Sequence, residues 1–300
     1  MTVKIIASEC CSGLFPKNSL SGFRYCIDNH IDGIEFDVHL SADGHVVVQH
    51  DYLLNPRITR DPSGDWLAKS GPPVSNLELA ELKTYDIGRY APGSHEVNGY
   101  PDYKPSDKEP IPTFVEFLDY HNKSNATSEL WVELKTSPYQ REISSDPLKL
   151  LETVLTDLAR ANLIGNTMLL AFEWDLLVTS KELQPEVRTD FLTINPEYIA
   201  ASNKKNGLVD TSLLFGTFDP KHYTQSIPHA ILAAGGIGWG PLVSDVNSGD
   251  VRQAQDLGLE VNLWGVGTTD AAMEDALAMN PDSITIARPD FLKEKLDFVS

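Results

Sequence analysis

The feature that most constrains the fold is an alternation of short apolar segments with amphipathic ones along 300 residues. Apolar segments rich in Val, Ile and Leu are predicted strands, at residues 3–7, 33–40, 129–135, 167–172, 188–193, 235–239, 260–266 and 283–286. Segments with apolar residues at helical spacing are predicted helices, at residues 20–27, 77–82, 113–121, 147–162, 174–183, 196–205, 249–257, 270–279 and 290–297. Strands that alternate with helices imply right-handed βαβ units and a parallel sheet.

Eight such strands favour a closed (β/α)8 TIM barrel, because this fold repeats the strand–helix unit eight times in a chain of about this length. We expect a single (β/α)8 barrel domain over residues 1–300, since no linker or internal repeat interrupts the alternation. A further strand at 46–50 is predicted as an insertion after the second barrel strand. Irregular insertions are expected around 45–75 and 88–111, where Pro and Gly are frequent.

The charge of the chain restricts its partners. Lys and Arg number 24 against 43 Asp and Glu, so the net charge is −19 and nucleic acid is not an expected partner. No apolar run reaches the roughly 18 residues of a membrane helix, so no integral membrane segment is expected. The N-terminal apolar stretch turns polar at Ser8, too early for a signal peptide, which favours a cytoplasmic protein. The sequence does not define the oligomeric state.

A group of carboxylates stands where barrel chemistry is expected, toward the carboxyl ends of strands. Glu35 and Asp37 are two apart on one strand and therefore point to the same face, as do Glu133 and Lys135 on the next barrel strand. Three inward carboxylates could hold a hard divalent cation, Mg²⁺ first, with Ca²⁺ or Mn²⁺ as alternatives. The alternative is that they only pair with Lys or Arg at the rim of the barrel.

Two further side chains suit phosphate chemistry. His50 follows a run of valines and is a candidate acid or base, because imidazole titrates near neutral pH. Lys135 could hold a phosphate as a point charge. Each has a purely structural alternative: a histidine that only packs, and a lysine that only pairs with Glu133.

Several motifs occur in a recognisable order. They are Asp32-Gly33-Ile34-Glu35-Phe36-Asp37-Val38-His39-Leu40, Val47-Val48-Gln49-His50-Asp51, Tyr85-Asp86-Ile87-Gly88-Arg89, Ile111-Pro112-Thr113, Val132-Glu133-Leu134-Lys135-Thr136 and Trp264. With these motifs the chain resembles the glycerophosphodiester phosphodiesterase family over most of its length. The resemblance implies a (β/α)8 barrel, a metal on Glu35, Asp37 and Glu133, a catalytic His50 and a phosphate-contacting Lys135.

The chain departs from the family pattern around the expected site. The family motif His-Arg-Gly reads Ser8-Glu9-Cys10 here, and Pro-Glu-Asn reads Pro16-Lys17-Asn18. The terminal Thr-Asp reads Ala287-Arg288. We expect Glu9 to point away from Ser8 on an extended strand, and Lys17 or Arg288 to replace the lost cation. The expected substrate-binding residues are therefore Ser8, Lys17, Trp264 and Arg288.

Three functions fit these residues. The favoured one is a metal-dependent phosphoester enzyme with an altered site, acting on a phosphodiester or related small phosphorylated substrate with His50 as its acid or base. A second is a Mg²⁺-dependent lyase or cyclase that ionises a prenyl diphosphate ester, because diphosphate leaves without a proton donor. A third is a catalytically inactive ligand-binding protein. The loss of one family histidine keeps all three open, since each acid–base group contributes about 10²–10⁴-fold to a rate.

Overall fold

The structure is a computed structural model, and it describes residues 3–94, 99–195, 212–224 and 226–299. Its strands are β1 (Lys4–Ala7), β2 (Gly33–Leu40), β3 (Val46–Val48), β4 (Glu129–Leu134), β5 (Thr167–Ala171), β6 (Arg188–Thr193), β7 (Gly238–Pro241), β8 (Glu260–Val266) and β9 (Ser283–Ile286). Its helices are α1 (Leu20–Asp28), α2 (Leu79–Leu82), α4 (Phe114–Lys123), α5 (Pro147–Ala161), α6 (Trp174–Leu183), α8 (Ser212–Phe215), α9 (Ile227–Ala233), α10 (Ser248–Asp256), α11 (Asp270–Ala278) and α12 (Pro289–Val299). The helix predicted at 196–205 lies outside the described residues.

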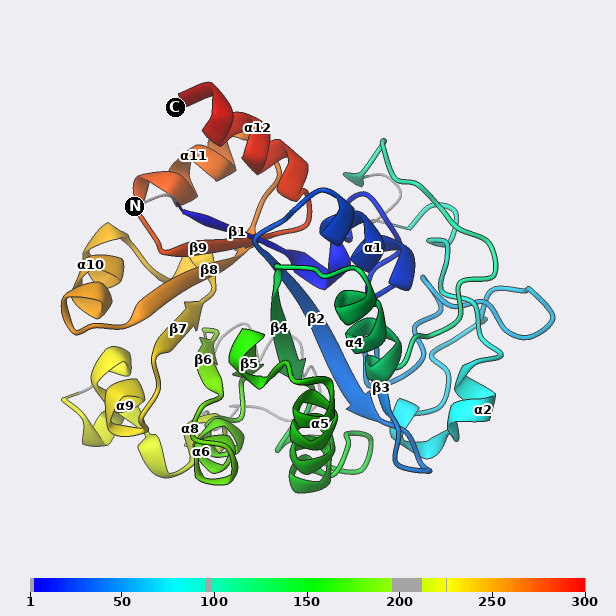
Figure 1. Cartoon of the computed structure of the whole chain (residues 1–300), viewed down its shortest axis with the longest axis horizontal. Coiled ribbons are helices and arrows are strands. Elements are labelled where there is room, and N and C mark those ends of the chain that lie inside the picture. Colours follow the sequence, from blue (N-terminus) through cyan, green and yellow to red (C-terminus); the bar gives the residue numbers. More distant parts are fainter. Residues whose placement is uncertain (1–2, 95–98, 196–211, 225, 300) are drawn as a thin grey trace. The chain divides into compact units, whose positions relative to one another are not determined.

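The strands form the sheet of a TIM barrel. Their order is β1-β9-β8-β7-β6-β5-β4-β2-β3, and β1 also pairs with β2, so eight strands close on themselves. The remaining strand, β3, pairs antiparallel with β2 outside this ring. Figure 1 shows helices between successive strands. The predicted (β/α)8 barrel, with an inserted strand after the second barrel strand, is confirmed.

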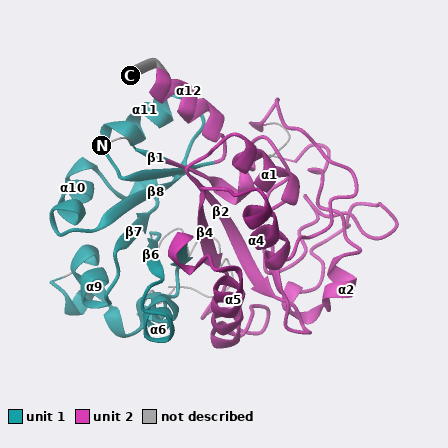
Figure 2. Cartoon of the chain, viewed as in Figure 1, with its two compact units in different colours: residues 1–4, 168–286 teal, residues 5–167, 287–300 magenta. Residues whose placement is uncertain are grey.

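The chain divides into two compact units (Figure 2). Unit 1 comprises residues 1–4 and 168–286, and unit 2 comprises residues 5–167 and 287–300. Unit 2 contains β2, β3 and β4 and every predicted site residue except Trp264. The prediction of one domain over 1–300 stays a prediction.

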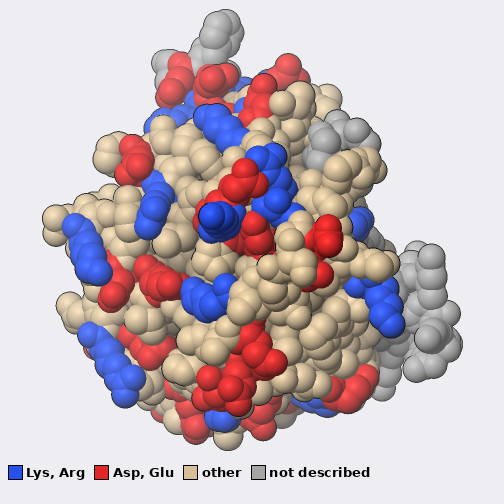
Figure 3. Space-filling view, turned by 90° about the vertical axis from the view of Figure 1, so that its right-hand side faces the viewer, with Lys and Arg blue, Asp and Glu red and all other residues tan. Residues whose placement is uncertain are grey.

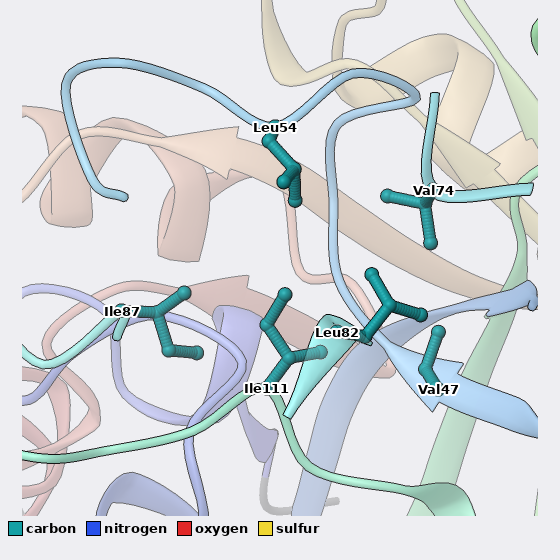
Figure 4. Packing of buried hydrophobic residues seen from close by; sticks show 6 residues of the cluster. All are labelled: Val47, Leu54, Val74, Leu82, Ile87 and Ile111. Carbon is teal, nitrogen blue, oxygen red and sulfur yellow. The ribbon is translucent and has the colours of Figure 1, made fainter. Parts of the chain in front are cut away.

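The irregular chain after β3 has its own apolar core. Its buried members are Val47, Leu54, Val74, Leu82, Ile87 and Ile111, which face one another in Figure 4. The strand-type pairing among the described residues of this region consists of isolated bridges, such as that between Leu53 and Pro73. Burial of these side chains therefore holds the long loops in place, and Val47 links them to β3, the strand that precedes His50.

Unit 1 contains a buried acidic side chain. Asp190 on β6 is 1% exposed, and its Oδ2 accepts a long hydrogen bond of 3.4 Å from Asn262 Nδ2. Asn262 Oδ1 in turn accepts hydrogen bonds from Ser283 and Thr285. Asp190 Oδ1 has no hydrogen-bond partner among the described residues. Burial raises the pKa of Asp190 to about 8, because the charged form is poorly solvated there.

The surface mixes both signs of charge. On the face in Figure 3, Lys and Arg side chains are separated by acidic and uncharged surface. Among the residues that the structure describes, no helix is long and apolar enough to cross a membrane.

The buried Asp190 predicts a pH-dependent gain in stability from Asp190→Asn. The folded protein keeps this proton up to a pKa of about 8, whereas an unfolded aspartate loses it near pH 3.9. The penalty of folding therefore grows with pH between these values, by about 1.4 kcal/mol per pH unit as an upper bound. Urea unfolding from pH 5 to 9 should show a gain that increases to about pH 8 and then levels off. A gain independent of pH would contradict this interpretation.

The loop core predicts a second stability effect. Leu82 is fully buried, so Leu82→Ala should lower the free energy of unfolding by about 2–5 kcal/mol. Leu183 is 49% exposed, and Leu183→Ala should change it by no more than about 0.5 kcal/mol. Urea unfolding of both variants measures the difference, and equal effects would show that the loop core does not contribute to cooperative unfolding.

Candidate active site

Three predicted metal ligands lie together in unit 2. Glu35 and Asp37 on β2 point to one face, and Asp37 is paired with Glu133 of the parallel strand β4. One carboxylate oxygen from each residue lies within 4.8 Å of the other two. Glu35 and Asp37 are buried, at 6% and 1% exposed. The structure thus brings together the three carboxylates predicted to share a face.

The carboxylates do not share one electrostatic environment. Burial, followed by the charges of Asp37 and Glu133, raises the pKa of Glu35 well above its ordinary value. Burial also acts to raise the pKa of Asp37, but Lys135, His50 and Asn18 outweigh it and lower that pKa. Asp37 therefore remains ionised, and Glu35 is the carboxylate that most needs an added positive charge.

Asn18 orients Asp37. Its Nδ2 donates to Asp37 Oδ2 at 2.7 Å, and its Oδ1 accepts from the backbone N–H of Asp37 at 3.1 Å. This two-point contact engages Oδ2, whereas the buried Oδ1 has no hydrogen-bond partner among the described residues. Ser19, the next residue, caps α1 by accepting from the N–H of Gly22, so the start of this helix fixes the position of Asn18.

Lys135 lies beside the carboxylates. Its Nζ is 2.8 Å from Glu133 Oε1 and 3.5 Å from Asp37 Oδ1. Burial acts to lower the pKa of Lys135, but the charges of Glu133 and Asp37 outweigh it and raise that pKa. The structural alternative, a pair with Glu133, is therefore present, and the ammonium group remains charged at the edge of the cluster.

His50 is held by its neighbour. Its Nδ1 lies 3.1 Å from Asp51 Oδ1, while Asp51 Oδ2 accepts from Asn55 Nδ2 at 2.7 Å. The charge of Lys135 and burial act to lower the pKa of His50, but Asp37 and Asp51 outweigh them and raise it. The strand predicted at 46–50 ends at Val48, and the backbone N–H of the next residue, Gln49, still donates to the carbonyl of Asp37 on β2.

The expected extended backbone at Glu9 was wrong. Glu9, Cys10 and Cys11 all have left-handed backbone, with φ of 45°, 60° and 68°, so the chain turns sharply after β1. The Glu9 side chain pairs with Lys17, with Nζ 3.0 Å from Oε1. One Glu9 carboxylate oxygen also lies within 4.8 Å of ligand atoms of Asp37 and His50. Glycine is the usual sequence signal for left-handed backbone, and residues 8–11 contain none, so this turn had no signal in the sequence.

The other predicted substrate-binding residues are placed as follows. Ser8 opens the short turn Ser8–Cys10 and is partly exposed. The guanidinium of Arg288 contacts Asp290 through Nε and one terminal nitrogen, and Asp102 through the other. These internal contacts disfavour Arg288 as a replacement phosphate ligand. Trp264, in unit 1, donates its indole N–H to the carbonyl of Gly240 at 3.0 Å.

Three positioning residues were not among the predicted site residues. Asn18 and Asp51 contact Asp37 and His50 directly. The buried His39 places Nε2 at 3.2 Å from the carbonyl oxygen of His50. His39 continues the two-residue period of Glu35 and Asp37, and Asp51 follows His50 directly, so both had a local signal in the sequence.

The chain is similar to known proteins over most of its length. The model of the family described as "Glycerophosphoryl diester phosphodiesterase family" matches residues 10–291. YqiK, an uncharacterised protein of Bacillus subtilis, is 30% identical over 197 residues, which cover 66% of this chain and 69% of that protein. A solved structure titled "Putative glycerophosphoryl diester phosphodiesterase" from Silicibacter pomeroyi is 26% identical with a TM-score of 0.84, and the match covers 99% of this chain and 94% of that one.

An Oleispira antarctica phosphodiesterase, solved with the product sn-glycerol-3-phosphate, shares the fold at 20% identity and a TM-score of 0.69, over 98% of this chain and 96% of that one. The family match extends from the turn after β1 to the start of α12 and includes all three clustered carboxylates. The chain belongs to the glycerophosphoryl diester phosphodiesterase family.

Proposed function

We propose that the protein is a divalent-metal-dependent phosphodiesterase that cleaves a glycerophosphodiester or a related small phosphodiester. The observation that carries this proposal is the buried cluster of Glu35, Asp37 and Glu133 with Lys135 and the Asp51-bound His50 beside it. Membership of the family supports the reaction class. The product held by the Oleispira antarctica relative supports a glycerol phosphate ester as the substrate class.

The three carboxylates are a suitable donor set for a divalent cation. Asp37 Oδ1 is buried without a hydrogen bond among the described residues, and the ammonium of Lys135 contacts Asp37 and Glu133. Oxygen donors of this kind suit Mg²⁺, and also Ca²⁺ or Mn²⁺. A cation held by Glu35, Asp37 and Glu133 would stabilise the negative charge that develops on the phosphoryl oxygens.

The remaining side chains have two roles, phosphate binding by the lysines and proton transfer by His50. The ammonium of Lys135 contacts the cluster, and that of Lys17 contacts Glu9, which has a carboxylate oxygen within 4.8 Å of a ligand atom of Asp37. Each ammonium is a point charge for a phosphate oxygen. Asp51 holds Nδ1 of His50, which assigns Nε2 to proton transfer. The raised pKa of His50 favours the imidazolium, so His50 acts as the acid that protonates the leaving alkoxide.

Metal binding predicts a stabilisation that depends on Asp37. Mg²⁺ added after treatment with EDTA should raise the melting temperature of the wild-type protein, by the equivalent of about 2.7 kcal/mol at a hundredfold excess over Kd. Asp37→Asn removes one charge from the cluster and should abolish most of this shift. Glu186→Gln, an exposed change in unit 1, should leave it unchanged. Equal shifts in all three proteins would place the cation elsewhere.

The reaction itself predicts metal-dependent release of choline and glycerol phosphate from glycerophosphocholine. His50→Gln should lower kcat by about 10²–10⁴-fold, because the leaving alkoxide then lacks its acid. A prenyl diphosphate incubated in parallel tests the alternative chemistry. Pyrophosphate release would indicate a lyase or cyclase, and no product from a panel of phosphodiesters and diphosphates would indicate a binding protein. Either result would overturn the proposed function.

A further inference from the structure

Glu9 occupies the candidate site without a role in the proposed function. One of its carboxylate oxygens lies within 4.8 Å of ligand atoms of both Asp37 and His50. The neighbouring Ser8 has a hydroxyl that neither gains nor loses a proton near neutral pH. Among the described residues of this turn, Glu9 is therefore the side chain suited to accept a proton beside His50.

The backbone of Glu9 is held from both sides. Its N–H donates to Glu35 Oε2 at 2.7 Å, and its carbonyl accepts from the N–H of Asn18 at 2.8 Å. These contacts maintain φ and ψ of 45° and 43°, a left-handed conformation that is unfavourable for a residue with a Cβ. Conformations of this kind persist only where surrounding contacts enforce them, and they gather at functional sites. The contacts therefore fix the backbone from which the side chain of Glu9 extends.

Lys17 restrains the same carboxylate. Its ammonium lies 3.0 Å from Oε1, and the two side chains are only 15% and 19% exposed. The contact balances the charge of Glu9 and limits its rotation. Because Lys17 contacts Oε1, the second oxygen, Oε2, is the one assigned to substrate or water.

We propose that Glu9 is the general base of this enzyme and His50 its general acid, an inference that rests on the proposed function. Glu9 Oε2 accepts a proton from a water molecule, whose oxygen forms the new bond to phosphorus. The bond from phosphorus to the alcohol oxygen breaks, and His50 Nε2 gives its proton to that oxygen. The products are a phosphate monoester and an alcohol, so atoms and charge balance for hydrolysis of a diester.

The experiment compares two leaving groups. Glycerophosphocholine releases an alkoxide that needs a proton, whereas a 4-nitrophenyl diester of glycerol phosphate releases a phenolate that does not. Glu9→Gln keeps the size of the side chain and should lower kcat by about 10²–10⁴-fold on both substrates, with KM little changed. His50→Gln should lose activity on glycerophosphocholine but retain most of it on the aryl ester. Glu9→Asp should recover part of the activity, because it restores a carboxylate.

Two controls separate a role in proton transfer from a role in folding. The Mg²⁺-dependent rise in melting temperature should persist in Glu9→Gln, because the three carboxylates of the cluster remain. Glu186→Gln should keep wild-type rates on both substrates. Its side chain is exposed in unit 1.

Several results would overturn the assignment of Glu9. They are wild-type rates in Glu9→Gln, a loss confined to KM, and a loss that the aryl leaving group rescues as it does for His50→Gln. If the wild-type protein were inactive on both substrates, the proposed function would be wrong. The assignment of Glu9, which rests on that function, would then fail as well.

Discussion

The register between β2 and β4 is the constraint on which the candidate site depends. Pairing of Asp37 with Glu133 puts carboxylates from two strands on one face, and a slip of one residue would turn one set to the other face. The same register brings Lys135, the residue after β4, within 3.5 Å of Asp37. Backbone hydrogen bonds of the barrel therefore assemble acidic groups that would repel one another in a free chain. The free energy of folding therefore offsets the electrostatic repulsion among these carboxylates.

Two loops complete the site by contributing side chains and backbone groups that lie beside its carboxylates. The turn after β1 contributes the N–H of Glu9 to Glu35, and Asn18, just before α1, contributes its amide to Asp37. The segment after β3 contributes His50, which Asp51 orients. The apolar loop core, which includes Val47, holds that segment in place. Rigid strands thus carry the proposed metal ligands, and loops carry the groups proposed to move protons.

Most of the fold could be predicted because its signal is local and repeated. The strand predicted at 283–286 matches β9 residue for residue, and the helix predicted at 174–183 matches α6. The common face of Glu35 and Asp37 followed from the two-residue period of a strand. The turn at Glu9 could not be predicted, because left-handed backbone without glycine comes from tertiary contacts rather than propensity. The internal pairing of Arg288 with Asp102 was equally invisible, since 186 residues separate the partners.

The contact between Glu9 and Lys17 restricts how a sequence like this one can diverge. The family motifs that this chain resembles have Arg and Glu at these two positions, so the pair is present here with its charges exchanged. An arginine at position 9 alone would face the ammonium of Lys17, and a glutamate at position 17 alone would face Glu9. Either single change places like charges about 3 Å apart in a largely buried contact. The two positions are therefore expected to covary among related sequences, with a neutral residue as the intermediate.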